Sequence, residues 1–480
     1  MSFNFRNFSV QKLAIIAPRY LPFADVASAE VPLLRLLRLS LFQVTVGMAL
    51  VLLVGTLNRV MIVELSVPTT LVAGMLALPL LFAPLRMLIG YKSDTFVSAL
   101  GWRRVPFIWK GTLYQFGGFA IMPFALLVLS GYGEAVDAPR WIGLSSAALA
   151  FFLVGAGAHM VQTTGLALAT DLVPEEDHPK VVGLMYVMLL LGMAASALIY
   201  GALLANYTPG RLIQVIQGTA VLTVGLNMLA IWKQEARDRT RARQMQVAQH
   251  PTFTQAWSQL VERPGMIRLL VVIGLGTFGF GMADVLLEPY GAQALGLSVG
   301  QTTQLTALFA FGTLAGFGYA SYTLGQGDVP AILGRLGAAL GVPGFLAIVL
   351  SADLMGTPLF LAGVFLTGLG AGLFGHATLT AAIRAAPFDR VGLSLGAWGA
   401  VQATCAGLGV ALAGITRDVL LGLESLHGIQ PQTPYRLVFM IEIAFLIATI
   451  LLARSLATSD QAGRKATLLT DTRPNPLEVS

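Results

Sequence analysis

Stretches of about 20 consecutive apolar residues recur along this 480-residue chain from Leu36 to Leu452, and they restrict its fold more than any other feature. Each stretch is long enough for an α-helix to cross the hydrocarbon core of a bilayer. Hydrophobic residues make up 56% of the chain and charged residues only 11%, whereas soluble domains contain roughly 25% charged residues. A water-soluble core could not bury this much apolar surface. The sequence therefore predicts an all-α integral membrane protein.

Twelve spans can be placed, six on each side of a charged linker. In the first half they cover roughly 36–63, 69–91, 106–129, 142–169, 181–205 and 212–232. In the second half they cover roughly 266–290, 301–324, 329–350, 358–384, 391–415 and 435–453. We predict five regions: a cytoplasmic N-terminal arm (1–35), a six-helix half (36–232), a cytoplasmic linker (233–265), a second six-helix half (266–454) and a disordered cytoplasmic tail (455–480).

Two of the predicted helices, one in each half, share a sequence pattern. Gly155-x-Gly157 in the fourth span matches Gly368-x-Gly370 in the tenth span. At the ends of these helices, Asp171-x-x-Pro174 matches Arg384-x-x-Pro387 with the same offset in residue number. A constant offset through a whole helix indicates two halves built on one plan. Such a pair of six-helix halves is typical of the large secondary-transporter folds.

Basic residues are concentrated in the loops on one side of the predicted bundle. The loop after the second span holds Arg103 and Arg104, and the linker holds Arg237–Arg243. Because short basic loops remain in the cytoplasm, we predict that both termini and the linker are cytoplasmic. The N-terminal arm lacks the compact pattern of a cleaved signal peptide, so the first span is expected to serve as the insertion signal.

The loop after the second span contains a recognisable motif. It reads Gly90, three residues, Asp94, and then Gly101 before the basic pair Arg103-Arg104. This order resembles the signature loop of the major facilitator superfamily. Gly90 would allow two helices to approach closely, and Asp94 could cap a helix N-terminus and pair with an arginine. We assign structural or gating roles to Gly90, Asp94, Arg103, Arg104, Asp171 and Arg384.

Four further stretches resemble a narrower family. They are Leu57–Leu65, Pro84–Arg86, Gly157–Leu168 and Asp284–Gly291. Together they are similar to the bacteriochlorophyll-delivery (PucC/LhaA) family, a branch of the major facilitator superfamily, and the resemblance covers nearly the whole chain. It implies the major facilitator fold, with about twelve transmembrane helices in two pseudo-symmetric six-helix halves.

The resemblance also implies a function and a location. Members of this family are associated with the assembly of light-harvesting antennae in purple phototrophic bacteria. We therefore expect bacteriochlorophyll as the bound pigment and antenna polypeptides, especially those of the core antenna, as partners. The reaction centre and pigment-synthesis enzymes are further possible partners. The expected location is the cytoplasmic (photosynthetic) inner membrane, and we expect contact with the lipid bilayer but not with nucleic acid.

Two histidines lie within predicted spans, where titratable groups are costly and are candidates for function. His159 lies near the midplane of the fourth span, and His376 lies on the same face of the tenth. A neutral imidazole can ligate a metal, including the magnesium of a chlorin. The alternative is a hydrogen bond to a neighbouring helix. The predicted pigment-binding residues are His159, His376, Gln162, Thr163 and Thr164, with the two histidines on opposite halves of one cleft.

Four charged residues form a second group of candidates within the spans. Asp284 and Glu288 share one face near the outer end of the seventh span, where they could pair with Arg59 of the first span. A structural ion pair and proton coupling are both open for these groups. Glu442 lies midway along the twelfth span, where it could be protonated, paired or directed at a partner protein.

Two other functional classes remain open beside pigment delivery. A proton-coupled small-solute transporter should place several charged groups on the first, fourth, seventh and tenth spans, whereas these spans are mostly apolar and glycine-rich. A scaffold could bind antenna polypeptides without pigment. An enzyme is not expected, because the chain has no phosphate-binding glycine loop, HExxH, CxxC or nucleophile elbow. The single cysteine, Cys405, also rules out a disulfide framework.

Overall fold

A computed structural model describes most of the predicted bundle. The described residues are 31–81, 101–131, 137–174, 177–235, 261–263, 265–354, 356–385, 391–427 and 432–471, with the isolated positions 28, 86, 89, 92, 93, 98, 135 and 258. Side chains are not described for 179, 391–393, 395, 423–427 and 455–471. Gly90, Asp94, most of the linker and the N-terminal arm up to residue 27 therefore lie outside the described residues.

The described part of the chain is helical, and its elements correspond to the twelve predicted spans. The first span combines α2 (Leu33–Leu39), α3 (Leu41–Leu50) and two π-helical segments, η2 (Val51–Leu57) and η3 (Val60–Glu64). The seventh span combines α12 (Met266–Gly281), the 3₁₀ segment η6 (Met282–Val285) and α13 (Leu287–Leu295). The other spans are α4 (Thr69–Leu81), α6 (Val105–Ser130), α7 (Arg140–Thr170), α8 (His178–Leu203), α9 (Pro209–Ile231), α14 (Val299–Gly325), α15 (Pro330–Ser351), α16 (Thr357–Ala385), α17 (Val391–His427) and α18 (Thr433–Asp471).

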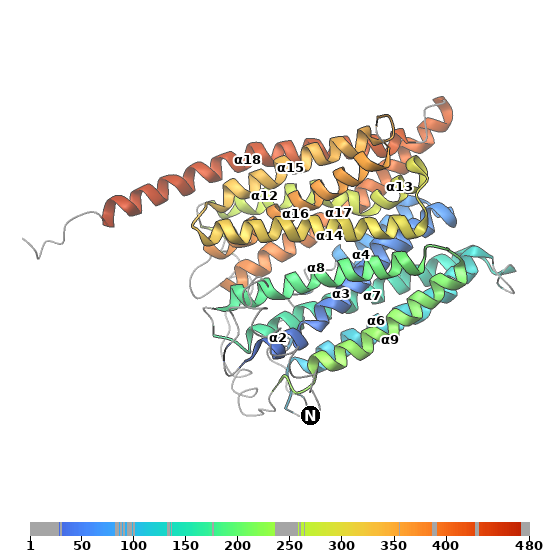
Figure 1. Ribbon diagram of the computed structural model, residues 1–480, viewed down its shortest axis with the longest axis horizontal. Coiled ribbons are helices and arrows are strands. Elements are labelled where there is room, and N and C mark those ends of the chain that lie inside the picture. The colour runs from blue at the N-terminus through green and yellow to red at the C-terminus, as the bar shows by residue number, and fades with distance from the viewer. Residues whose placement is uncertain are drawn as a thin grey trace, which may run out of the picture.

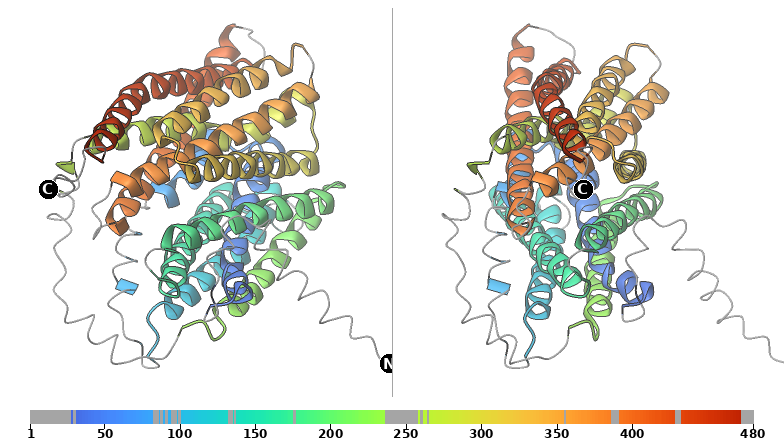
Figure 2. Two further views of the ribbon diagram at one scale, coloured as in Figure 1. Left: turned by 60° about the vertical axis from the view of Figure 1, so that its left-hand side comes forward. Right: turned by 90° about the vertical axis from the view of Figure 1, so that its left-hand side faces the viewer.

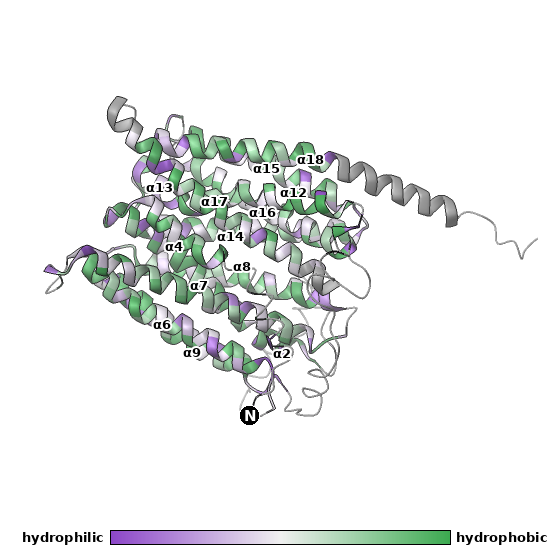
Figure 3. Cartoon of the chain, turned by 180° about the vertical axis from the view of Figure 1, so that it is seen from behind, coloured by the Kyte–Doolittle hydropathy of each residue, from purple (hydrophilic) through white to green (hydrophobic). Residues whose placement is uncertain are grey.

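The helices form two bundles that lie side by side (Figure 1). The first half, coloured blue to green, lies mainly below the second half, yellow to red, in both views of Figure 2, and the two overlap where they meet. Contact between them runs mainly through α4 against α17 and α8 against α14. Ten helices of the described part are long and apolar enough to cross a membrane, and α4 is a shorter apolar helix. Apolar residues cover the helix lengths, while polar residues gather towards the ends (Figure 3).

The glycine pairs identified in the sequence occupy equivalent packing positions in the two halves. A side chain at Gly157 would meet the carbonyl of Gly111 on α6, and one at Gly370 would meet the carbonyl of Gly337 on α15. Likewise, a side chain at Gly155 would meet Pro79 on α4. Its counterpart at Gly368 would meet the backbone of α14. In lipid the hydrophobic effect does not drive helices together. Van der Waals packing at these close contacts between backbones therefore stabilises the association of the helices. The shared plan of the two halves is therefore visible in their contacts.

Replacing Gly157 by alanine should destabilise the first half. An added methyl carbon would lie 2.5 Å from a backbone oxygen and 2.7 Å from the Gln115 nitrogen, neither of which can rotate away. Overpacking of this kind costs roughly 1–3 kcal/mol, and the midpoint of thermal unfolding in detergent should fall accordingly. Gly117 on the same helix pair is the matched control, because nothing lies within 4 Å of a methyl group there. Gly117→Ala should leave the midpoint unchanged or raise it; an equal loss in both variants would contradict the argument.

Polar groups at one end of the bundle tie the helices of the first half together. We call this end the basic end and define it by Arg103, Arg104 and Lys233; it is the predicted cytoplasmic side. Asp171, at the end of α7, accepts hydrogen bonds from Arg103 (3.0 Å) and Arg104 (3.2 Å). Glu235 accepts hydrogen bonds from the backbone N–H groups of 103–105, which begin α6.

The repeat-related position in the second half carries the opposite charge and binds differently. Arg384, near the end of α16, donates to the carbonyls of Leu324 (3.3 Å) and Asp328 (3.2 Å). A cation is favourable there, because the last carbonyls of a helix such as α14 have no intrahelical partners. Both halves thus fasten the fourth helix of the repeat to its neighbours: in the first half through an ion pair to two buried arginines, and in the second half through the two backbone carbonyls named above.

The C-terminal region differs from the sequence prediction. We predicted a disordered tail from residue 455, whereas α18 continues without a break to Asp471 (Figure 1). Residues 455–471 contain three alanines and three leucines, which favour helix, and the first proline comes only at Pro474. The end of the membrane span therefore does not end the helix.

Candidate functional site

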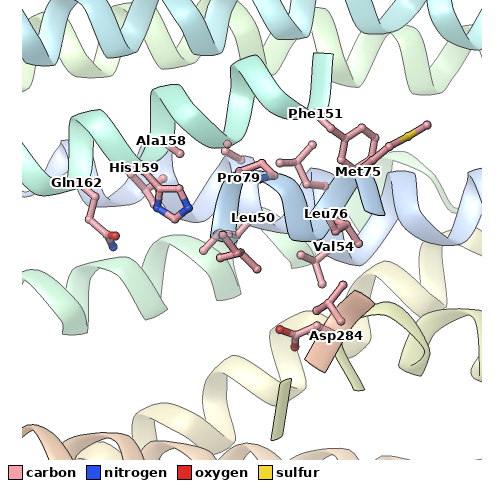
Figure 4. A pocket seen from close by; sticks show the side chains of 16 residues that line it. Leu50, Val54, Met75, Leu76, Pro79, Phe151, Ala158, His159, Gln162 and Asp284 are labelled. Atoms are coloured by element: carbon pink, nitrogen blue, oxygen red, sulfur yellow. The ribbon is translucent and has the colours of Figure 1, made fainter. Parts of the chain in front are cut away.

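A cavity of about 100 Å³ lies at His159 between the first, second and fourth spans (Figure 4). Of its 16 lining residues, only His159, Gln162 and Asp284 carry polar side chains. Gly155 and Pro79 form one wall of the cavity. The backbone of α7 at Gly155 lies directly against the ring of Pro79 on α4. Asp284 reaches the cavity from the seventh span, so both halves contribute to it. The site is apolar, with one imidazole and one carboxyl at its margins.

Arg86 organises the polar side of this cavity, although it was not among the site residues predicted from the sequence. Its guanidinium donates to Gln162 Oε1 (2.8 Å) and to Thr163 Oγ1 (2.9 Å). It also lies close enough to His159 and Tyr186 to interact with both electrostatically. The signal was present in the sequence, because Arg86 is the one charged residue in the predicted second span. A cation inside a span is a candidate for function whatever its neighbours are.

The three polar residues predicted beside His159 are therefore not equivalent. Gln162 donates to Gln43 Oε1 (3.4 Å) and accepts from Arg86, so it lines the cavity while already bonded. Thr163 also accepts from Arg86. Thr164 is fully buried, and its hydroxyl donates to the carbonyl of Met160 (2.7 Å) on its own helix. The structure therefore places Thr164 against its helix backbone rather than in the cavity.

His376 lies on a second cavity, of about 140 Å³, formed by spans five, eight, ten and eleven. Its ring packs against Phe317, with a centroid separation of 4.1 Å, and Trp398 and Gln402 of α17 complete the wall. This cavity shares no lining residue with the cavity at His159. The two histidines therefore do not face one common cleft as the sequence reading predicted.

The predicted pairing of Arg59 with Asp284 and Glu288 is wrong. Arg59 forms an ion pair with Glu64 and donates to the carbonyl of Leu297 (3.4 Å). The reason is the π-helical segment η3, because a π-helix makes i→i+5 hydrogen bonds and brings residues five apart onto one face. Asn58, not Arg59, reaches the seventh span from the first.

Three carboxyl groups gather around the break in the seventh span. The amide of Asn58 donates to the carbonyls of Asp284 (3.3 Å) and Val285 (3.2 Å), which stabilises the short 3₁₀ segment η6. Glu288 is buried, and one of its oxygens accepts from Thr306 (3.2 Å). Glu442 is fully buried and lies near Asp284 and the Ala283 backbone N–H, and neither carboxyl oxygen has a hydrogen bond of good geometry to a residue that the structure describes. Glu442 thus faces the inside of the second half, which removes the option that it faces a partner protein.

Neither histidine cavity offers space for a whole tetrapyrrole in this conformation. The cavities enclose about 100 and 140 Å³, whereas ligand pockets typically enclose about 300–1,000 Å³. The imidazoles have the right chemistry for an axial ligand, but the macrocycle does not fit beside them. Within the described part of the chain, no group of three or more His, Cys, Asp and Glu side chains could hold a metal ion.

Comparisons with known proteins agree on the family and the fold. Residues 56–461 match the family described as "PUCC protein". The chain is 70% identical to "Protein PucC" of Rhodobacter capsulatus over 452 residues, which cover 94% of this chain and 98% of that protein. It is 27% identical, over 91% of its length and 98% of the relative, to a protein of the same species named "Bacteriochlorophyll synthase 44.5 kDa chain".

A solved structure shows the same fold at low sequence identity. The chain superposes on a bacterial homologue of the human lysosomal transporter Spinster, in an inward-facing and unoccupied conformation, with a TM-score of 0.64 and 16% identity. The match covers 91% of this chain and 98% of that structure. At this identity the likeness shows the fold alone, which is that of the major facilitator superfamily as the sequence predicted.

Proposed function

Because this chain belongs to the PUCC family, we propose that it is a membrane assembly factor for photosynthetic light-harvesting complexes, with the core antenna as its client. In this role it binds bacteriochlorophyll as cargo and delivers it, shields nascent antenna polypeptides, or does both. It acts without enzymatic chemistry, in the cytoplasmic inner membrane of a phototrophic bacterium, with both termini on the cytoplasmic side. The named relative in bacteriochlorophyll synthesis supports the choice of pigment.

The observation that carries the proposal is the apolar lining of the cavity at His159, which we call the central cavity. Thirteen of its 16 lining residues are apolar or glycine, and its polar residues are a histidine, an amide and a carboxyl. A transporter of small polar solutes needs several convergent polar groups to replace the water that its substrate loses. A hydrophobic cargo needs few such groups, so this apolar lining argues against a small polar solute, although the cavity at His159, at about 100 Å³, does not itself hold a whole pigment in this conformation.

Proton-coupled transport of a small solute is the second candidate, and one observation favours it. Asp284, Glu288 and Glu442 lie together at the break in the seventh span, and intramembrane carboxyl groups are typical of proton relays. The two candidates differ in what the purified protein carries, since a pigment gives a visible and near-infrared absorption spectrum and a proton-coupled solute does not.

Purification in mild detergent from phototrophically grown cells tests the proposal. We expect the full chain to retain bacteriochlorophyll through size-exclusion chromatography, and we expect a strain lacking the protein to assemble less core antenna, measured by the near-infrared absorption of its membranes. The control strain expresses the Gly117→Ala variant, which the packing argument leaves folded. A colourless protein together with normal antenna levels in the deletion strain would refute the proposal.

A further inference from the structure

A third cavity, of about 860 Å³, opens at the basic end between the start of α6 and the end of α9. These two helices pack against each other at the edge of the first half, and α2 lies beside their basic end (Figure 1). This volume falls within the range of about 300–1,000 Å³ that is typical of ligand pockets. The cavity is thus several times larger than the two histidine cavities. Its lining residues include Trp102, Trp109, Trp232, Met228, Ile231 and Lys233.

The walls of this cavity are held by hydrogen bonds, so the space is preformed. Arg35 of α2 donates to Gln234 Oε1 (3.2 Å) and to the Gln234 carbonyl (3.0 Å), and Arg38 donates to the carbonyl of Trp232 (2.8 Å). On the other side, Glu235 binds the first N–H groups of α6. Ser98 accepts from the backbone N–H of Trp102 (2.8 Å), which closes the turn before α6.

The lining combines flat aromatic surface with one available positive charge. Trp232 is 58% exposed and Met228 is 45% exposed, so apolar surface faces the opening. Of the charged residues that line the cavity, Arg35 is bonded to Gln234 and Glu235 to the α6 backbone. Lys233 is exposed and makes no hydrogen bond or ion pair with any residue that the structure describes.

Lys233 is also held in an unusual backbone conformation. Its φ is +53°, and Ser66 is the one other non-glycine residue with positive φ in the described part of the chain. The left-handed region costs a residue with a Cβ atom roughly 1–2 kcal/mol, and strain of this kind is concentrated at functional sites. Lys233 follows Trp232, the residue that caps the end of α9, and lines the same cavity as Trp102, Trp109 and Trp232.

We propose that this cavity at the basic end binds the tetrapyrrole ring of the cargo, with the ring against the tryptophans and an acceptor group on its edge at Lys233. The inference rests on the proposed function and names its site. Tryptophans at the ends of spans lie at the membrane–water interface, so the cavity is positioned to receive an amphipathic ring directly from one leaflet. The apolar tail of such a ligand can remain in the lipid beside α6 and α9.

A flat ring explains the lining better than a phospholipid head group does. Three indoles offer broad faces, and aromatic faces favour stacked or edge-to-face contact with another ring system. A phosphate group would need several convergent donors, whereas a single ammonium without a partner lines this cavity. The ring's keto and ester oxygens require one donor, and Lys233 can supply it.

The test titrates purified full-length protein, freed of pigment, with bacteriochlorophyll a in detergent. Binding is measured by quenching of tryptophan emission and by pigment retained on size-exclusion chromatography. Replacing Trp109 and Trp232 together by leucine removes two aromatic contacts to the ring, so affinity should fall about tenfold, which corresponds to about 1.4 kcal/mol. Trp141→Leu is the matched control, because Trp141 is also exposed at 67% but lies at the opposite end of α7.

Two variants of Lys233 distinguish the effect of its charge from the effect of its left-handed backbone conformation. Lys233→Asn removes the charge while keeping a residue that tolerates the left-handed conformation, and it should weaken binding several-fold. Lys233→Arg should retain binding. Both changes are on the surface, so folding should be unaffected, and the thermal midpoint checks this. The double variant His159→Phe/His376→Phe should bind pigment as the unmodified protein does.

The outcomes distinguish this site from the proposed function. If the unmodified protein binds no pigment, the proposed function fails and this site fails with it. If the protein binds pigment, but the histidine double variant loses it and the tryptophan and lysine variants do not, the site is wrong while the function stands. If phosphatidylglycerol vesicles displace the pigment from the unmodified protein and from Lys233→Asn equally, the cavity is a lipid site and the inference is overturned.

Discussion

Replacing Asp171 by alanine should destabilise the protein by about 3 kcal/mol. Its carboxylate accepts hydrogen bonds from Arg103 and Arg104, whose side chains are only 10% and 7% exposed. Removing one partner of a buried, hydrogen-bonded charge pair costs about 2–5 kcal/mol, although Arg104 keeps its bond to Ser93 (2.6 Å) when Asp171 is replaced. Asp171 itself is 29% exposed, and this partial contact with solvent places the expected loss in the middle of that range.

The repeat supplies a matched control for this variant. Arg384 occupies the equivalent position in the second half, is exposed, and donates to two backbone carbonyls. A cation at a helix C-terminus contributes about 0.3–1 kcal/mol, so Arg384→Ala should have a several-fold smaller effect. The measurement is the midpoint of thermal unfolding in one detergent for both variants. Equal shifts would show that the two ends are fastened equally and that burial of the arginines does not matter.

This asymmetry was anticipated in part from the sequence. The sequence reading matched Asp171 to Arg384 by their common offset, and in the structure each lies at the end of its helix and contacts neighbouring segments. Sequence could not give their partners, because these depend on how the loop before α6 folds back over α7. The predicted role of Asp94 in the same region stays a prediction, since that residue lies outside the described part of the chain.

The fold followed from sequence because bilayer thickness fixes span length, and helix packing in lipid requires small residues at contacts. The glycine pairs at Gly155 and Gly368 are examples in which sequence pattern and contact agree. Irregular helices were not predictable in this way. The sequence reading paired Arg59 with the seventh span because both lie near the outer ends of their spans, whereas the π-helical turn brings Arg59 to Glu64 instead.

The candidate sites were harder to predict, because the position and size of a cavity depend on how the helices pack in three dimensions. The small residues around His159 suggested room for a macrocycle. In the structure, however, neighbouring helices occupy the space beside these glycines; Pro79 of α4, for example, lies against Gly155. The tryptophans and Lys233 of the larger cavity were not among the predicted site residues, because they lie at span ends, where aromatic and basic residues are common. Their convergence depends on the meeting of three separate segments of the chain.

Replacing Glu442 by methionine should stabilise the protein and impair its function. Glu442 is fully buried in α18, and neither carboxyl oxygen has a hydrogen-bond partner. An unsatisfied buried polar group costs about 1–3 kcal/mol, and methionine has a similar length and shape, so the unfolding midpoint should rise. A residue that costs stability and makes no structural bond is expected to serve function instead.

The functional part of this prediction depends on the neighbours of Glu442. It lies beside Asp284, which lines the central cavity where the two halves meet, so a change of charge at Glu442 is felt at that cavity. Antenna assembly in a strain carrying Glu442→Met should therefore fall, although the protein is more stable and inserts normally. Glu442→Gln separates two causes, since the amide can form hydrogen bonds but cannot ionise. If the glutamine variant also impairs assembly, ionisation is the property required.

Met440 provides the control on the same helix, because it is 47% exposed on the outer face, two residues from Glu442. Met440→Leu should change neither the unfolding midpoint nor antenna assembly. A lower midpoint in Glu442→Met would mean that the carboxyl is bonded in the membrane-embedded protein and has a structural role. A higher midpoint with unchanged antenna assembly would leave the carboxyl without a function in assembly, and the three carboxyls at the break in the seventh span would then have to be tested for proton coupling of a transported solute.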